Sequence, residues 1–368
     1  MKQKRIFFLD LIRVFSIIII MMIHCFYAKC PDKLPHTAFD AAIYLPVFFV
    51  GTAGVGLLVM TSGALILPKE LREGYRFLWR RVLGFGLLIA FWSVVTNTVV
   101  YICQGRPPGE ALLFSLRYHS VIIGGWGNYA GHLWFLLMIM SLYLAAPFLA
   151  RMIEKMPVRD YFVFAGITAL LFLVPGTFNY QGRLLGLLEA DFAGIMGRFD
   201  LFGVYASWFI LGYLFTTVDM EAYLGRWSRH YLAWLWGILL VSSLSGGYAV
   251  YKLTVMNNLQ LFVPMIQFTK SLPMYINVLT MFLLFKHYAQ KLEFLQKPIN
   301  MLAKYSFGLY LIHFPMITVV SVLLAGWGMD SSTHILVITP VCFLLTMVFS
   351  LALSMVLYRF RLTRYLIK

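Results

Sequence analysis

The chain is dominated by uninterrupted apolar stretches that are long enough to cross a lipid bilayer. A spanning helix needs about 20 predominantly apolar residues. Such runs recur near residues 7–27, 43–66, 82–103, 132–150, 158–175, 201–218, 231–250, 270–288, 304–324 and 335–357. Charged residues make up only 12% of the chain, against about 25% in soluble domains. Because the runs are continuous and do not alternate, they exclude barrel strands. The sequence predicts an all-α integral membrane protein with about ten transmembrane helices.

The distribution of Lys and Arg predicts how these helices are oriented, because cytoplasmic segments carry an excess of positive charge. With the N-terminus inside, 21 of the 30 Lys and Arg fall in inner segments and eight in outer ones, and the remaining one is Arg13. Both termini are therefore predicted to be cytoplasmic. The net charge of +15 follows from this topology. Its spread over six inner segments gives no indication of nucleic-acid binding.

The sequence predicts one transmembrane domain over residues 1–368, with no appended soluble domain. The first apolar run is long, contains Arg13 and lacks a small-x-small pattern before Lys29, so we expect a retained span and not a cleaved signal peptide. The cysteines show no metal-ligand spacing, and no metal site is predicted; they are Cys25, Cys30, Cys103 and Cys342. Cys30 and Cys103 both fall near the outer face, so a disulfide between them stays an open alternative.

Arg13 and His24 stand 11 residues apart in the first apolar run. At 100° per residue this is three turns plus 20°, so both side chains leave one face of the helix, separated by roughly 16 Å along its axis. Ionisable groups in a span normally face the protein interior or a water-filled cavity, which indicates that this face lines a passage. Alternatively, Arg13 reaches back to the inner interface and His24 packs between helices.

A cluster of arginines begins the third apolar run: Arg76, Arg80 and Arg81. Two interpretations remain open for it. Guanidinium groups bind phosphates through paired hydrogen bonds, which indicates a cytoplasmic site for an anionic ligand. The same cluster is also typical of anchoring to anionic lipid.

The order of several motifs resembles the membrane-bound acyltransferase-3 family. The stretch from Asp10 to Arg13, followed by ten residues and His24, resembles that family's first-span signature. Further stretches match in the same order: VMTSGALI at 59–66, RFLWRRVL at 76–83, GHLWFL at 131–136 with LYLAAP at 142–147, and KYSFGLYLIH at 304–313. The fourth span lacks the acidic residue of one branch. In this respect the chain is similar to the single-domain branch, which includes the enterobacterial common antigen O-acetyltransferase and a polysaccharide O-succinyltransferase.

The resemblance implies a membrane O-acyltransferase of the bacterial cytoplasmic (inner) membrane. It would move an acyl group, usually acetyl, from cytoplasmic acyl-coenzyme A to a hydroxyl of a cell-surface or lipid-linked glycan. Acetyl-CoA or succinyl-CoA would be a co-substrate, with no tightly bound cofactor, and the oligomeric state stays open.

The resemblance also implies roles for individual residues. His24 would act with Arg13 in catalysis, as a general base or through an acyl-histidine intermediate. The residues implied for acyl-CoA binding are Arg76, Arg80, Arg81 and Ser62, and those implied for the acceptor are His132, Trp134, Tyr310 and His313. Interfacial anchoring, ring packing and close helix approach are the structural alternatives for Ser62 and the acceptor set.

A transporter or flippase of a glycan precursor is the alternative function class. Proton-coupled carriers place carboxylates deep within their spans, whereas the acids here lie mainly in loops or at span ends, with Asp10 nearest to an exception. Many carriers also have paired halves with broken helices, and no such symmetry is visible in the sequence. The Arg13 and His24 pair therefore favours acyl transfer.

Overall fold

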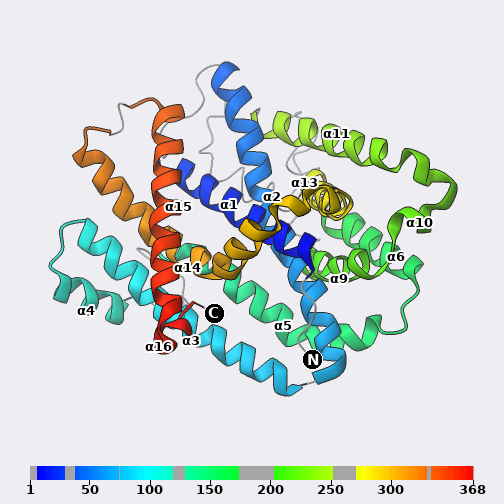
Figure 1. Cartoon of the computed structure of the whole chain (residues 1–368), viewed down its shortest axis with the longest axis horizontal. Helices are drawn as coiled ribbons and strands as arrows, with labels where there is room; N and C mark the ends of the chain where they lie inside the picture. The colour runs from blue at the N-terminus through cyan, green and yellow to red at the C-terminus, as the bar shows by residue number, and fades with distance from the viewer. Residues whose placement is uncertain are drawn as a thin grey trace. The chain divides into compact units, whose positions relative to one another are not determined.

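The computed structural model describes residues 6–29, 38–73, 75–118, 129–173, 203–251, 271–329 and 333–367, and their regular structure is helical throughout (Figure 1). The α-helices are α1 (Phe7–Lys29), α2 (Ala38–Glu73), α3 (Tyr75–Cys103), α4 (Pro108–Tyr118), α5 (Trp134–Ile153), α6 (Val158–Thr168), α9 (Gly203–Thr217), α10 (Met220–Leu224), α11 (Tyr231–Tyr251), α13 (Leu272–Tyr288), α14 (Gln296–Gly326), α15 (Ile335–Arg359) and α16 (Arg361–Arg364). No strand occurs in these ranges, so the all-α prediction is confirmed for them.

Six helical segments in the described ranges are long and apolar enough to cross a membrane: Phe7–Phe26, Val50–Lys69, Arg81–Cys103, Gly131–Ile153, Gln290–Gly326 and Leu336–Arg359. They coincide with six of the ten predicted runs. Two shorter apolar helices, Val204–Thr217 and Tyr231–Gly246, coincide with two more. The chain is therefore a multi-pass membrane protein. Ten spans and cytoplasmic termini remain predictions.

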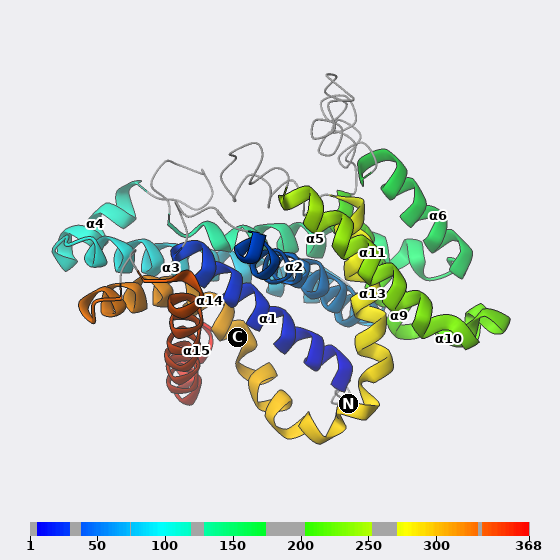
Figure 2. The same ribbon diagram turned by 90° about the horizontal axis from the view of Figure 1, so that it is seen from above.

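The chain divides into two compact units. The first comprises residues 1–19, 32–74 and 145–296, and the second comprises residues 20–31, 75–144 and 297–368. Helices α1 and α5 each contribute residues to both units. In the first unit, α11 runs beside α13, and in the second, α3 runs beside α4 (Figures 1 and 2). That the whole chain acts as one domain remains a prediction.

In the first unit, α2 and α9 cross with their backbones in direct contact. A Cβ atom at Gly63 would lie 1.8 Å from the carbonyl oxygen of Phe209, and one at Gly212 would lie 2.0 Å from that of Met60. Small residues permit such approaches between membrane helices, where van der Waals packing replaces the hydrophobic effect as the source of association. Gly63 of the VMTSGALI motif therefore has a structural role in this crossing.

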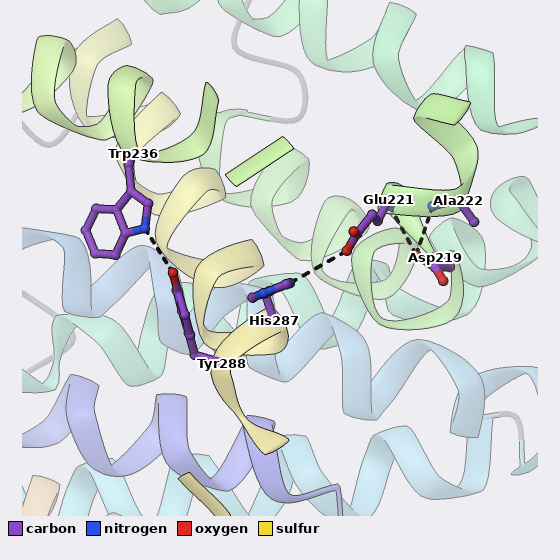
Figure 3. A network of polar contacts seen from close by, with 6 residues as sticks. All are labelled: Asp219, Glu221, Ala222, Trp236, His287 and Tyr288. Atoms are coloured by element: carbon purple, nitrogen blue, oxygen red, sulfur yellow. Dashed lines mark hydrogen bonds and ion pairs between the residues drawn. The ribbon is translucent and has the colours of Figure 1, made fainter. Parts of the chain in front are cut away.

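Polar contacts tie the ends of α10, α11 and α13 together in the first unit (Figure 3). The carboxylate of Asp219 accepts a hydrogen bond from the backbone N–H of Glu221 at 3.1 Å, which caps α10. Nδ1 of His287 lies 3.6 Å from the carboxylate of Glu221. Nε1 of Trp236 on α11 donates to the hydroxyl of Tyr288 on α13 at 3.2 Å. The Asp219 contact satisfies a backbone N–H that lacks a helical partner, and the other two contacts join side chains of different helices.

In the second unit, the C-terminal segment folds back onto α3 and α14. Nε1 of Trp92 on α3 donates to the carbonyl of Leu366 at 2.6 Å. A Cβ atom at Gly308 on α14 would lie 2.8 Å from Oγ of Ser354 and 3.5 Å from Cβ of Ile367. Residues both before the end of α15 (Ser354) and after it (Ile367) therefore pack closely against α14.

The α2–α9 crossing predicts that added side-chain volume lowers stability. Gly63→Ala and Gly212→Ala should each lower the free energy of unfolding by about 2 kcal/mol or more, because a rigid backbone must shift to admit the methyl group. Gly84→Ala and Gly237→Ala are matched controls, since nothing lies within 4 Å of their added Cβ atoms. These controls should be neutral or gain up to about 1 kcal/mol from better helix propensity. Thermal unfolding of purified protein measures both, and equal stability of all four variants would contradict the crossing.

Ten spans and six spans predict different sides of the membrane for Lys252, so the accessibility of that position distinguishes them. With ten spans, a cysteine replacing Lys252 is extracellular and should react with a membrane-impermeant maleimide in intact cells. Lys155→Cys, on a predicted cytoplasmic segment, should react only after permeabilisation. Protection of both positions in intact cells would show that residues 154–289 remain on the cytoplasmic side and would support six spans.

Candidate histidine site

The second unit brings together three histidines that are far apart in the sequence. His24 lies on α1, His132 in the 3₁₀ turn Gly131–Leu133 before α5, and His313 on α14. His132 is 4% exposed and His313 is fully buried, while His24 is half-buried. Nδ1 of His24 lies 2.9 Å from Nε2 of His313. The rings of His132 and His313 meet edge-on, with centroids 5.4 Å apart. These three residues are called the histidine cluster below.

Aromatic side chains enclose the histidine cluster. Phe314 stacks on His132 with ring centroids 4.7 Å apart and meets His24 edge-on at 5.7 Å. The hydroxyl of Tyr310 donates to the backbone carbonyl of His132 at 2.6 Å. Since Tyr310 and His313 stand three residues apart on α14, they share a helix face. That face of α14 therefore contacts both the 3₁₀ turn, through Tyr310, and the His24 ring, through His313.

The hydrogen-bond network assigns the protons on two of the rings. Nδ1 of His313 lies 2.6 Å from the carbonyl oxygen of Tyr310. A carbonyl only accepts, so this nitrogen carries a proton, and Nε2 of the neutral ring is an acceptor. Nδ1 of His24 therefore donates to Nε2 of His313. The lone pair of His24 is then on Nε2, which is the nitrogen able to accept a proton from a ligand.

His132 has unused hydrogen-bonding capacity. Both of its ring nitrogens are buried, and neither forms a well-aligned hydrogen bond with a described residue, although the backbone of Leu311 lies near enough to interact with the ring. Buried polar atoms normally find a partner, and one left alone costs roughly 1–3 kcal/mol. The ring is therefore suited to bind a polar atom of a ligand or a water molecule.

Two aromatic residues next to the sequence motifs take different positions. Phe135, which lies within the GHLWFL motif but was assigned no role from the sequence, has its ring 5.6 Å from that of Tyr310. Trp134, expected to bind the acceptor, is 45% exposed and packs edge-on against Phe135. Phe314 was also missed, although it directly follows His313. The only signal for either phenylalanine was its place beside a motif residue.

Arg13 lies in the first unit and contacts an acid on its own helix. Its Nη1 lies 3.1 Å from Oδ1 of Asp10, three residues earlier. The Asp10 side chain is 6% exposed and that of Arg13 is 30% exposed. The ion pair compensates a buried carboxylate near the start of α1. Helix α1 is continuous from Arg13 to His24, as the apolar run at 7–27 predicted. That their shared face lines a passage remains a prediction.

The residues expected to bind the acyl donor lie on two helices. Ser62 is half-buried on α2, beside the α2–α9 crossing. The Arg81 guanidinium lies 5.7 Å from the ring centroid of Tyr143. Arg76 and Arg80 are on α3, and their side chains fall outside the described part of the structure.

Two further features lie apart from the histidine cluster. A groove of about 580 Å³ in the first unit is lined by α11 and α13, including Trp234, Ser242 and Pro273, and contains none of the predicted site residues. The described residues contain no group of three or more His, Cys, Asp or Glu arranged to hold a metal ion. The open Cys30–Cys103 pairing falls outside the described residues.

The Tyr310 hydroxyl predicts a measurable contribution to stability. Tyr310→Phe keeps the ring but leaves the His132 carbonyl without this donor, so it should lower the free energy of unfolding by roughly 1–3 kcal/mol. Tyr305→Phe is the control, because the Tyr305 hydroxyl accepts only an exposed contact from Lys304 at 3.3 Å. Thermal unfolding of both variants tests this, and an unchanged Tyr310→Phe would show that the bond is dispensable.

Comparison with known proteins gives one match. The model of a family described as an acyltransferase domain, acyltransferase-3, matches residues 6–359, which is nearly the whole chain. No curated protein and no solved structure matches the chain.

Proposed function

The chain belongs to the acyltransferase-3 family, and on that premise we propose that it is an O-acyltransferase that uses acyl-coenzyme A to modify a glycan hydroxyl. The family match and the membrane helices support acyl transfer within a bilayer. The observation that carries the proposal is the hydrogen bond between His24 and His313 at 2.9 Å. It leaves a basic nitrogen in an enclosed site, as transfer to a hydroxyl requires.

In the proposed reaction, Nε2 of His24 takes the proton of the acceptor hydroxyl as its oxygen attacks the thioester carbonyl. A carbon–oxygen bond forms, the carbon–sulfur bond breaks, and coenzyme A leaves as the thiol with the proton returned from His24. While His24 holds that proton, its Nδ1–H donates to His313, which stabilises the positive ring. A covalent acyl-histidine route would use the same Nε2 as nucleophile.

The remaining site residues have proposed supporting roles. His132, with two ring nitrogens available, binds the acceptor hydroxyl, and Tyr310 holds the backbone of its turn. Arg13 precedes His24 by 11 residues on α1, about 16 Å along the axis. The pantetheine arm of the donor would extend over a comparable length. We propose that Arg76, Arg80 and Arg81 bind the donor phosphates and that Ser62 is a further donor-binding residue.

The donor and the setting are also proposed. Acetyl-CoA is the first donor to test and succinyl-CoA the second, with a lipid-linked saccharide or a finished polysaccharide as acceptor. The proposed location is the bacterial inner membrane. The family match gives no support to the transporter alternative.

The histidine pair predicts distinct kinetic effects. His24→Ala should lower kcat by about 10²–10⁴-fold, the usual contribution of general acid–base catalysis. His313→Gln should lower kcat less and leave the donor KM unchanged, because it removes the partner of the base and not a donor contact. Transfer of radiolabelled acetyl from acetyl-CoA, by purified protein in sealed vesicles with a glycan acceptor, measures both.

His230→Ala serves as the matched control, since His230 is exposed and lies outside the histidine cluster. It should retain parental activity. Full activity of His24→Ala would overturn the proposed base. Failure of the parent protein to deacylate acetyl-CoA, succinyl-CoA and longer donors would overturn the acyltransferase proposal itself.

A further inference from the structure

Positive charge in the second unit is not balanced by acids at its predicted cytoplasmic end. Residues 75–81, 297–304 and 359–368 contain nine Lys and Arg and no Asp or Glu. Among the predicted cytoplasmic segments of the first unit, residues 69–73, 151–160, 219–229 and 286–293 contain nine cations and seven acids, whereas residues 2–5 contain three cations and no acid. Membrane orientation depends on Lys and Arg and little on acids. Orientation alone therefore does not explain why these three segments of the second unit lack acids.

The fold brings cations from two separate segments onto one aromatic ring. Nζ of Lys304 on α14 lies 4.4 Å from the ring centroid of Tyr358, and the guanidinium carbon of Arg364 on α16 lies 4.7 Å from the same centroid. Nε of Arg364 also donates to the Tyr358 carbonyl at 3.0 Å. Contact with the ring gives each cation roughly 0.5–1 kcal/mol. It does not remove the repulsion between them, which a bound anion would.

The C-terminal segment that carries Arg361 and Arg364 is held in place. The carbonyl of Leu366 accepts from Trp92, and Ile367 is buried against α14. The short α16 between these contacts and α15 therefore presents its arginines from a fixed backbone. A preorganised arrangement of this kind loses less freedom on binding than a free tail would.

The beginning of α3 lies close to the same part of α14. The rings of Phe85 and Phe307 have centroids 6.1 Å apart. Phe85 follows Arg81 by one helical turn, and Phe307 follows Lys304 by nearly one turn. Helices α3 and α14 are therefore in contact at these two rings. The basic cluster is defined here as Lys304 on α14 with Arg361 and Arg364 on α16.

We propose that the basic cluster binds the phosphate groups of the acyl donor, so that the C-terminal segment forms part of the donor site. This inference rests on the proposed function for the identity of the ligand. Coenzyme A carries a diphosphate and a separate 3′-phosphate, and a group of several cations matches that charge. Arginine binds phosphate oxygens through two parallel hydrogen bonds, and lysine adds a point charge. Lipid headgroups share the phosphate chemistry, so the test separates the two sources.

The test uses the full-length protein in nanodiscs of phosphatidylcholine, with adenosine 3′,5′-diphosphate as the probe. Lys304→Gln and Arg364→Gln should each weaken binding of the probe by about tenfold, and the double variant by about a hundredfold, as expected for lost charge-assisted hydrogen bonds. The donor KM should rise by similar factors while kcat stays unchanged. Arg364→Lys keeps the charge and should restore part of the affinity.

Lys291→Gln is the matched control. Lys291 also lies over a tyrosine, 5.3 Å from the ring centroid of Tyr288, but its segment contains Glu293. This variant should bind the probe as the parent does. Parental probe affinity in the double variant would overturn the proposal. A second result would also overturn it: the parent does not bind the probe, and phosphatidylglycerol nanodiscs stabilise the parent but not the double variant. The cluster would then bind lipid.

The outcomes separate this proposal from the proposed function. Probe binding that depends on Lys304 and Arg364 without any acyl transfer would retain the phosphate site and overturn the acyltransferase. Acyl transfer with an unchanged donor KM in the double variant would retain the acyltransferase and overturn this site.

Discussion

A bilayer offers no hydrogen-bond partners to the backbone, and this constraint governs the structure at every level. It requires helices throughout the membrane-spanning part of the chain, and it makes each polar side chain within a span depend on another part of the protein. In the first unit it leaves close packing as the main attraction between helices, which explains why Gly63 and Gly212 sit where the backbones of α2 and α9 meet. In the second unit it explains why the histidines gather.

The histidine cluster has the arrangement expected of a site that handles protons in an apolar enclosure. His313 is oriented by a backbone carbonyl of its own helix, and it orients His24 in turn. Positioning by a second group is what gives a histidine one defined basic nitrogen. Among the described residues, none forms a well-aligned hydrogen bond with the ring of His132, which leaves that ring available to a ligand. The two kinds of histidine therefore suit different tasks in the proposed transfer.

The predicted cytoplasmic segments of the two units differ in their content of acidic residues. Apart from residues 2–5, the cytoplasmic segments predicted for the first unit mix acids with bases, and contacts such as that between His287 and Glu221 use both. The corresponding segments of the second unit contain only bases, and a docked C-terminus holds some of them near α14. Since acids have little influence on membrane orientation, their absence there is consistent with selection for binding an anion.

The sequence by itself determined that the chain is helical and membrane-spanning, because apolar length decides both. Its motifs indicated the family, and its spacing placed Arg13 and His24 on one helix. Sequence reasoning assigned His313 to the binding of the glycan acceptor and missed Phe314. Only the tertiary structure showed that His313, 289 residues away, is the hydrogen-bond partner of His24. Helical periodicity decides which residues share a face of one helix. Which helix that face meets depends on packing between distant segments, and no local pattern records it.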